Sequence, residues 1–150
     1  MIVKTVMSNP EFGLQEQLIA LIRAFGLHRP DQTPCGEPVA VAEAHALMEL
    51  AHGVPLSQND LAARLQLEKS TVSRLVGILE SRGWIARVRS AQDGRVRELH
   101  LTDTGRQIAA DLAEARRTKF ARVFAAIPEA ERGAVFKSLQ ILVEAMRESQ

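Results

Sequence analysis

The feature that most constrains this chain is a change of hydrophobic period within residues 57–102. Before Gly83 the apolar residues recur at intervals of three and four, and after it two stretches alternate between apolar and polar residues. Intervals of three and four place side chains on one face of a helix, whereas alternation is the period of a strand. The stretch is therefore predicted to form two short helices, a strand, a charged loop and a returning strand, which is the order of a winged helix-turn-helix.

The first of the two helices is predicted to begin at Ser57. Ser57 and Asp60 stand three residues apart, so each side chain can bond the backbone amide of the other in a capping box. Three apolar residues are expected to face inward from this helix: Leu61, Ala62 and Leu65. The turn is then formed by residues 66–68.

The second helix, which starts near Lys69, is amphipathic. Its apolar stripe is predicted to consist of Val72, Leu75, Val76 and Leu79. Its outward face carries short, hydroxylated or basic residues, namely Lys69, Ser70, Ser73, Arg74 and Gly77. A free face of this kind suits a DNA groove.

The alternating stretches that follow indicate a β-hairpin. They lie within residues 84–89 and 96–101, and the SAQDG segment at residues 90–94 supplies turn-forming residues between them. We expect the tip of this hairpin to be the wing.

Helices are also predicted on both sides of the winged unit. Asn9 and Pro10 start a helix that Gly26 ends, and a loop rich in proline and glycine follows it. A largely buried helix is expected over residues 41–51, with Val41, His45, Met48 and Ala51 on one face and Leu47 and Leu50 beside them. A long helix should run from residue 102 to about residue 126, and the last helix should start at residues 128–129.

The first and last helices carry apolar stripes at opposite ends of the sequence. We expect these stripes to pack together and against a second subunit, because each helix is too apolar on one side to face water. The residues assigned to this dimer interface are Leu14, Leu18, Leu21, Val135, Leu139, Leu142 and Met146.

The charge of the chain is nearly balanced overall but not locally. The net charge is +1, yet residues 57–106 contain nine basic and six acidic residues. Any attraction to a polyanion must therefore come from this region. A length of 150 residues and 46% hydrophobic content fit one domain with a real core. With one cysteine and no apolar run long enough for a signal peptide or a membrane span, a soluble cytoplasmic protein without a membrane partner is expected.

Several segments together resemble the MarR family of bacterial transcription regulators. The segment LEKSTVSRLVGILESR at residues 67–82 is followed by GW, by DGR and by LHLTDTGR. The helix pattern alone is shared by several winged-helix families, whereas the wing pattern, with Asp93 and Arg95 two apart before a strand that ends in Leu101, Thr102 and Gly105, is much more specific.

The resemblance implies a fold and a mode of action. The fold would be mainly α with a small β-hairpin wing (α+β), a winged helix-turn-helix flanked by N- and C-terminal dimerisation helices. Within a single domain of residues 1–150, residues 39–102 would form the DNA-binding lobe and residues 9–27 and 103–148 the dimerisation helices. A homodimer would bind a roughly palindromic double-stranded DNA operator, act as a repressor and be released by a small-molecule effector. No cofactor is implied.

Roles on the binding face follow from side-chain chemistry. Arg74 is expected to read a base edge, because a guanidinium can bond both acceptors of guanine. The donors near it, suited to phosphates or nearby bases, are Lys69, Ser70, Thr71 and Ser73. Ser57 and Gln58 open a helix whose terminal amides favour a phosphate. By resemblance, Arg95 enters the minor groove and Asp93 holds its guanidinium. Arg87, Arg89 and Arg97 would flank it as contacts to the DNA backbone, with a solvated charge as the open alternative for Arg87 and Arg97. Asp93 with Arg95 could instead merely stabilise the turn.

Other interpretations remain open beside this one. The sequence has no pairing of nucleophile and base, no metal-ligand spacing and no phosphate-binding glycine loop, so no enzymatic activity is expected. A winged helix that binds protein is the rival. Cys35 could sense oxidants, and Cys35 with histidines such as His45 could bind a metal, but an ordinary thiol and a packed or hydrogen-bonded His45 are favoured. His45 could also line a ligand cleft.

Overall fold

The structure, a computed structural model, describes residues 9–150. These fall into two compact units, one extending to Ala115 and the other spanning Arg116–Gln150, and each is described by itself. The expectation that the chain has no N-terminal signal segment concerns mainly residues 1–8, which lie outside the described part. Within the described residues no helix is long and apolar enough to cross a membrane.

Helix α2 (Pro10–Phe25) begins and ends at the predicted residues. The side chain of Asn9 accepts a hydrogen bond from the amide of Phe12 at 3.1 Å, and Pro10 occupies the first helical position. Gly26 ends the helix with φ of 94°, a left-handed conformation that a residue with a Cβ rarely adopts.

Helix α3 (Val41–Leu50) is largely buried, as predicted, and Leu47 and Leu50 of its predicted apolar surface lie in the core. Its buried side chains are Glu43, Ala44, Ala46, Leu47 and Leu50. The predicted face was wrong at its polar and C-terminal positions, because His45 and Ala51 are exposed. Apolar residues surround this short helix, so periodicity alone did not determine which side meets the core.

The helix-turn-helix consists of α4 (Gln58–Leu65) and α5 (Lys69–Ser81). Gln66, in the turn between them, adopts φ of 54° and ends α4. The apolar stripe predicted for α5 is confirmed, since all four of its residues are buried. They pack with α3 and α4 in a core whose most deeply buried side chains are Leu47, Leu61, Val72, Val76 and Leu79.

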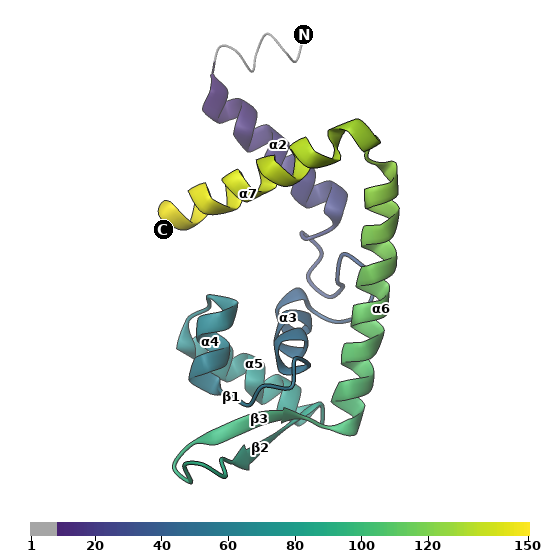
Figure 1. Cartoon of the computed structure of the whole chain (residues 1–150). Coiled ribbons are helices and arrows are strands. Elements are labelled where there is room, and N and C mark those ends of the chain that lie inside the picture. Colours follow the sequence, from purple (N-terminus) through teal and green to yellow (C-terminus); the bar gives the residue numbers. More distant parts are fainter. Residues whose placement is uncertain (1–8) are drawn as a thin grey trace. The chain divides into compact units, whose positions relative to one another are not determined.

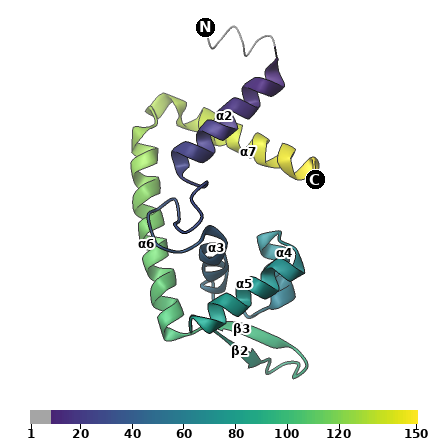
Figure 2. The same ribbon diagram turned by 180° about the vertical axis from the view of Figure 1, so that it is seen from behind.

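Three antiparallel strands form a sheet in the order β1-β3-β2. The predicted hairpin is β2 (Ile85–Arg89) and β3 (Arg97–Leu101), paired so that Arg87 lies opposite Leu99. The sequence did not reveal β1 (Leu56–Ser57), because two residues carry no detectable alternation. In both ribbon views α3, α4 and α5 lie along one side of the sheet (Figures 1 and 2).

The start of helix α6 (Asp103–Ala126) is fixed tightly to the end of the hairpin. The hydroxyl of Thr102 donates to the carbonyl oxygen of Gly83 at 2.6 Å and accepts from the amide of Gly105 at 3.0 Å. A Cβ at Gly105 would lie 1.9 Å from the carbonyl oxygen of Trp84. Only glycine fits where the helix approaches the backbone this closely.

A buried carboxylate joins α3 to the end of α5. Glu43 is buried, and Arg82 Nη1 donates to its Oε2 at 2.5 Å. The guanidinium of Arg82 also lies 4.9 Å from the centre of the Trp84 ring. A buried charge requires such a partner, so this pair belongs to the scaffold of the lobe.

The second unit contains the end of α6, a short 3-10 helix (Glu129–Glu131) and α7 (Arg132–Glu148). The predicted last helix therefore starts with a 3-10 turn. The rings of Phe124 and Phe136 lie 6.2 Å apart, and the guanidinium of Arg132 lies 4.3 Å from the centre of the Phe124 ring. Within residues 116–150 no side chain is fully buried, so this unit has no enclosed core of its own.

Candidate nucleic-acid interface

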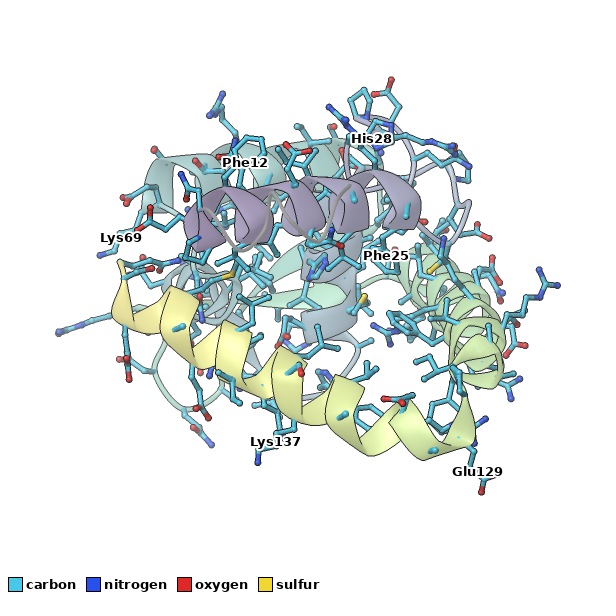
Figure 3. All side chains as sticks on the ribbon, turned by 90° about the horizontal axis from the view of Figure 1, so that it is seen from above. Phe12, Phe25, His28, Lys69, Glu129 and Lys137 are labelled. Atoms are coloured by element: carbon cyan, nitrogen blue, oxygen red, sulfur yellow. The ribbon has the colours of Figure 1, made fainter. Side chains whose placement is uncertain are left out.

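The outward face of α5 is free and carries the predicted residues. Lys69, Ser70, Ser73 and Arg74 are exposed, and Thr71 is half-buried. Figure 3 shows the side chain of Lys69 extending away from the ribbon at the start of the helix. The structure confirms that this face is free of the core.

The start of α4 is held by the predicted capping box. Asp60 Oδ2 accepts the amide of Ser57 at 2.9 Å, and Ser57 Oγ accepts the amide of Asp60 at 3.1 Å. The backbone hydrogen bond from Ser57 lowers the pKa of the Asp60 carboxyl, and the Ser57 hydroxyl acts in the same direction. The box uses the Ser57 hydroxyl and one helix amide, so a phosphate at this end would meet the amides of the first two helical residues.

The wing loop is shaped by its own short polar residues. Ser90 Oγ accepts the amides of Gln92 and Asp93 at 3.2 and 3.3 Å, and Asp93 Oδ1 accepts the amide of Arg95 at 3.0 Å. The expectation that Asp93 holds the guanidinium of Arg95 was wrong in detail, because the carboxylate bonds the backbone instead. Asp93 therefore shapes the loop, and the Arg95 side chain is left exposed. Turn patterns could have suggested the part played by Ser90.

The nine basic residues of residues 57–106 divide into two groups. Four of them pair with carboxylates: Arg64 with Glu49, Arg82 with Glu43, Arg87 with Glu80 and Arg106 with Asp103. The other five are exposed and have no ion pair within residues 9–150; these are Lys69, Arg74, Arg89, Arg95 and Arg97. All five belong to the predicted DNA-contact set. The unneutralised charge thus lies on α5 and the wing.

Two of the free cations face each other across the hairpin. Arg89 and Arg97 are directly opposite partners in the register of β2 and β3. Like charges at this position destabilise a hairpin by a few tenths of a kcal/mol unless an anion lies between them. The arrangement therefore favours a polyanionic partner over a purely structural role.

Arg87 differs from the other predicted contacts. Its Nε donates to Glu80 Oε2 at 3.2 Å and its Nη1 donates to Gln58 Oε1 at 3.3 Å. The side chain is 31% exposed, so the guanidinium lies partly inside the lobe. Neither partner was anticipated from the sequence, because Gln58 and Glu80 are 29 and 7 residues away from Arg87.

A second charged group lies on the opposite face of the hairpin. Ser90 lowers the pKa of the Glu98 carboxyl most strongly, and His100, whose Nε2 lies 3.1 Å from Glu98 Oε2, lowers it further. Glu98 and His100 alternate with Arg97 and Leu99 along β3. The acidic residue of this strand therefore lies away from the Arg89 and Arg97 face.

An open groove of about 490 Å³ lies between the end of α3, the hairpin and α6. Its wall is mostly apolar, with polar groups at His100 and Arg106. Its lining residues also include Leu50, Val54, Pro55, Leu99, Ala109 and Ala110. His45 does not line it and has no described hydrogen bond, so the expectation of a packed or hydrogen-bonded His45 was wrong.

The cysteine and histidines give no metal site in the described part of the chain. No three His, Cys, Asp or Glu side chains among residues 9–150 are grouped to hold a metal ion. Cys35 is half-buried and unpaired by any disulfide. The ordinary thiol that the sequence favours over an oxidant sensor stays a prediction.

The residues assigned to a dimer interface are only partly covered in the single chain. Leu14 and Leu21 on α2 are about half exposed, and Leu18 is half-buried. On α7, Leu139 and Met146 are exposed while Val135 and Leu142 are half-buried.

Parts of this chain are similar in sequence to known proteins. Residues 38–96 match the model of the MarR family. The chain is similar to the uncharacterised HTH-type transcriptional regulator YdgJ of Bacillus subtilis, with 32% identity over 69 residues, which is 46% of this chain and 42% of that protein. It is also 32% identical over 96 residues to a putative transcriptional regulatory protein for the hcr operon of Thauera aromatica, covering 64% of this chain and 58% of that protein. The chain thus spans about half the length of these curated relatives.

Solved structures agree with the fold over nearly the whole chain. FabT of Streptococcus pneumoniae in complex with DNA aligns with a TM-score of 0.70 at 23% identity, covering 96% of this chain and 98% of that chain. PcaV of Streptomyces coelicolor in complex with its natural ligand aligns with a TM-score of 0.68 at 23% identity, covering 94% and 96%. At this identity the likeness shows the fold alone. The chain thus has the fold of these solved structures, and its residues 38–96 match the MarR family model.

Proposed function

We propose that this chain is a sequence-specific DNA-binding transcription regulator that binds an imperfect palindrome as a homodimer and acts as a repressor. The observation that carries this proposal is the division of the basic residues. Between residues 57 and 106, every basic residue that has no ion pair with a carboxylate is on α5 or the wing. There it could meet a major groove, a minor groove or the DNA backbone.

The roles of the contact residues follow from their positions. Arg74 is the base-reading residue, because it lies on the free face of α5 one turn from the helix start. Lys69, Ser70, Thr71 and Ser73 are donors to phosphates or nearby bases. Arg89, Arg95 and Arg97 belong to the wing, with Asp93 shaping the loop that presents Arg95. Ser57 and Gln58 stay assigned to a phosphate at the start of α4.

Dimerisation is proposed through the apolar residues of the first and last helices. These are the residues Leu14, Leu18, Leu21, Val135, Leu139, Leu142 and Met146. Several of them are about half exposed in the single chain, so covering the rest of each side chain in an interface is worth roughly half of the 1.5–3 kcal/mol of full burial. A symmetric dimer would present two copies of α5 to half-sites about one turn of DNA apart.

Release by a small-molecule effector is the second part of the proposal. The groove between α3, the hairpin and α6 has room for such a ligand, and its apolar wall with two nitrogen-bearing side chains suits an amphipathic molecule. PcaV, which shares the fold, was crystallised with its natural ligand. Replacing Ala110, which lines the groove, by Phe should abolish any ligand-induced loss of DNA binding while DNA binding itself persists.

The test of DNA recognition is selection of bound sequences from a pool of random duplexes. The full chain should enrich an imperfect palindrome, whereas a folded double variant, Arg74→Ala with Arg95→Ala, should enrich none. Thermal unfolding of both proteins serves as the folding control. Equal recovery of all sequences by the unaltered chain would refute the regulator and favour the rival, a winged helix that binds protein.

A further inference from the structure

One arginine at the base of the wing holds three elements together. Arg87 is the central residue of β2, and its guanidinium bonds Gln58, the first residue of α4, and Glu80, in the last turn of α5. No other described side chain of the hairpin bonds a side chain on either helix of the helix-turn-helix. The polar side-chain connection is therefore a single guanidinium, which adds to the packing of Ile85 and Leu99 in the shared core.

The register of the sheet explains why the side chain points to the helices. Arg87 lies opposite Leu99, and Leu99 lies opposite Leu56 on β1. Directly opposite residues share a face of the sheet, and Leu99 and Leu56 are both buried. Arg87 is thus on the core face, in the row just before the free pair Arg89 and Arg97.

We propose that Arg87 is a positioning residue of the DNA-binding surface rather than a phosphate contact, and that it sets the angle between the wing and the helix-turn-helix. This inference rests on the proposed function. Glu80 compensates the charge of Arg87, and two of its five N–H groups are occupied, whereas the neighbouring Arg89 is free. Arginine suits the task because its planar fork reaches two acceptors on different elements at once.

The bond to Gln58 also orients a predicted contact. Because Gln58 Oε1 accepts from Arg87, the amide nitrogen of Gln58 is the end of the group that remains available as a donor. It lies at the first turn of α4, where the helix amides favour an anion. Arg87 thus fixes which end of Gln58 can face a phosphate.

The first experiment uses the free full-length protein and needs no DNA. Amide hydrogen exchange is measured for residues 57–60 in the unaltered chain, in Arg87→Met and in the matched control Arg89→Met. We expect exchange there to accelerate several-fold in Arg87→Met alone, at temperatures where exchange of the core amides of α5 is unchanged. Gln58→Met, which removes only the acceptor on α4, should accelerate it too. Unchanged exchange at residues 57–60 in both Arg87→Met and Gln58→Met would overturn the inference.

The second experiment measures binding to the selected palindrome at a series of salt concentrations. Arg87→Met should weaken binding about tenfold, because it removes both hydrogen bonds that position the wing, with an unchanged salt slope. Arg89→Met should reduce the slope by about 0.9 for each phosphate that the variant no longer neutralises. Arg87→Lys keeps the charge but not the fork, so it should bind as weakly as Arg87→Met.

These outcomes distinguish failure of the inference about Arg87 from failure of the proposed DNA-binding function. Full rescue by Arg87→Lys, or a slope that falls in Arg87→Met as it does in Arg89→Met, would make Arg87 a phosphate contact and overturn the inference. If the unaltered chain selects no sequence, the proposed function fails, and the exchange measurement still decides whether Arg87 fixes the start of α4.

Discussion

Helices α5 and α7 have apolar residues at the same helical spacing but place them in opposite surroundings. In α5, Leu79 is completely buried against α3 and α4, whereas in α7, Leu139 is 44% exposed and Phe136 is 57% exposed. The winged region encloses its own core, and the unit that contains α7 does not. An apolar stripe therefore indicates that a helix needs a partner, without indicating whether that partner lies in the same chain.

The largest expected effect of a substitution is in the enclosed core of the winged region. Leu79→Ala should lower the free energy of unfolding by about 2–5 kcal/mol, because it removes buried methyl groups and leaves a cavity. Urea unfolding followed by circular dichroism measures the change. Leu139→Ala is the matched control on α7; a decrease as large as that of Leu79→Ala at concentrations where the protein is monomeric would contradict the contrast between the two helices.

The same comparison predicts a concentration-dependent effect on α7. Leu139→Glu should shift the protein from dimer to monomer, because a carboxylate would have to be buried unpaired in the proposed interface. Sedimentation velocity at micromolar concentration measures the shift. Lys137→Glu is the control, because Lys137 is exposed and is not one of the residues assigned to the interface. Figure 3 shows its side chain extending from α7. Equal dimerisation of Leu139→Glu and the unaltered chain would remove Leu139 from the interface.

A smaller effect is expected on the outer face of α5. Arg74→Ala should reduce discrimination at particular base pairs of the selected palindrome by about 1–3 kcal/mol, because alanine cannot form the bidentate bond to guanine. Binding to single-base variants of the palindrome measures it. Arg64→Ala, whose guanidinium pairs with Glu49, should leave discrimination unchanged. Uniform weakening over all sequences in Arg74→Ala would identify a phosphate contact instead.

The smallest effect concerns the cap of α4. Asp60→Asn should cost about 1 kcal/mol at pH 7, because it removes a charge-assisted hydrogen bond from the capping box. The folded state lowers the pKa of Asp60, so this stabilisation is present above the ordinary value of 3.8 and is lost as the pH falls through the folded pKa. Unfolding free energies of both proteins should therefore converge in acid. A difference that persists unchanged below that pKa would contradict the assignment.

The sequence predicted the elements well where local chemistry specifies them. The capping box at Ser57, the helix stop at Gly26 and the buried stripe of α5 depend on neighbours within a few residues, and all three are confirmed. It failed for β1, whose two residues form a strand only because β3 lies beside them. It also chose the wrong face for His45 on α3, because that short helix has apolar residues on several sides.

At the candidate site, too, the sequence predicted some features and missed others. Residue type and spacing identified the exposed hydroxyl and basic residues of α5, but not which arginines would be neutralised. Arg87 and Arg89 look equivalent in the sequence, yet one pairs with Glu80 and the other stays free. The carboxylate of Asp93 likewise bonds the backbone of Arg95 rather than its side chain, because the loop conformation decides which donor is within reach.

The sequence by itself thus determined the order of the elements, the inward faces of α4 and α5 and the concentration of positive charge between residues 57 and 106. These follow from local periodicity and from counting charges. Only the tertiary structure decided which of those charges remain available to a partner, because an ion pair depends on distances between segments such as Arg82 and Glu43 that are 39 residues apart in the chain. Gly105 depends on a distant segment in the same way. The sequence motif includes this glycine, but its steric reason, the nearby carbonyl of Trp84, is seen only in the tertiary structure.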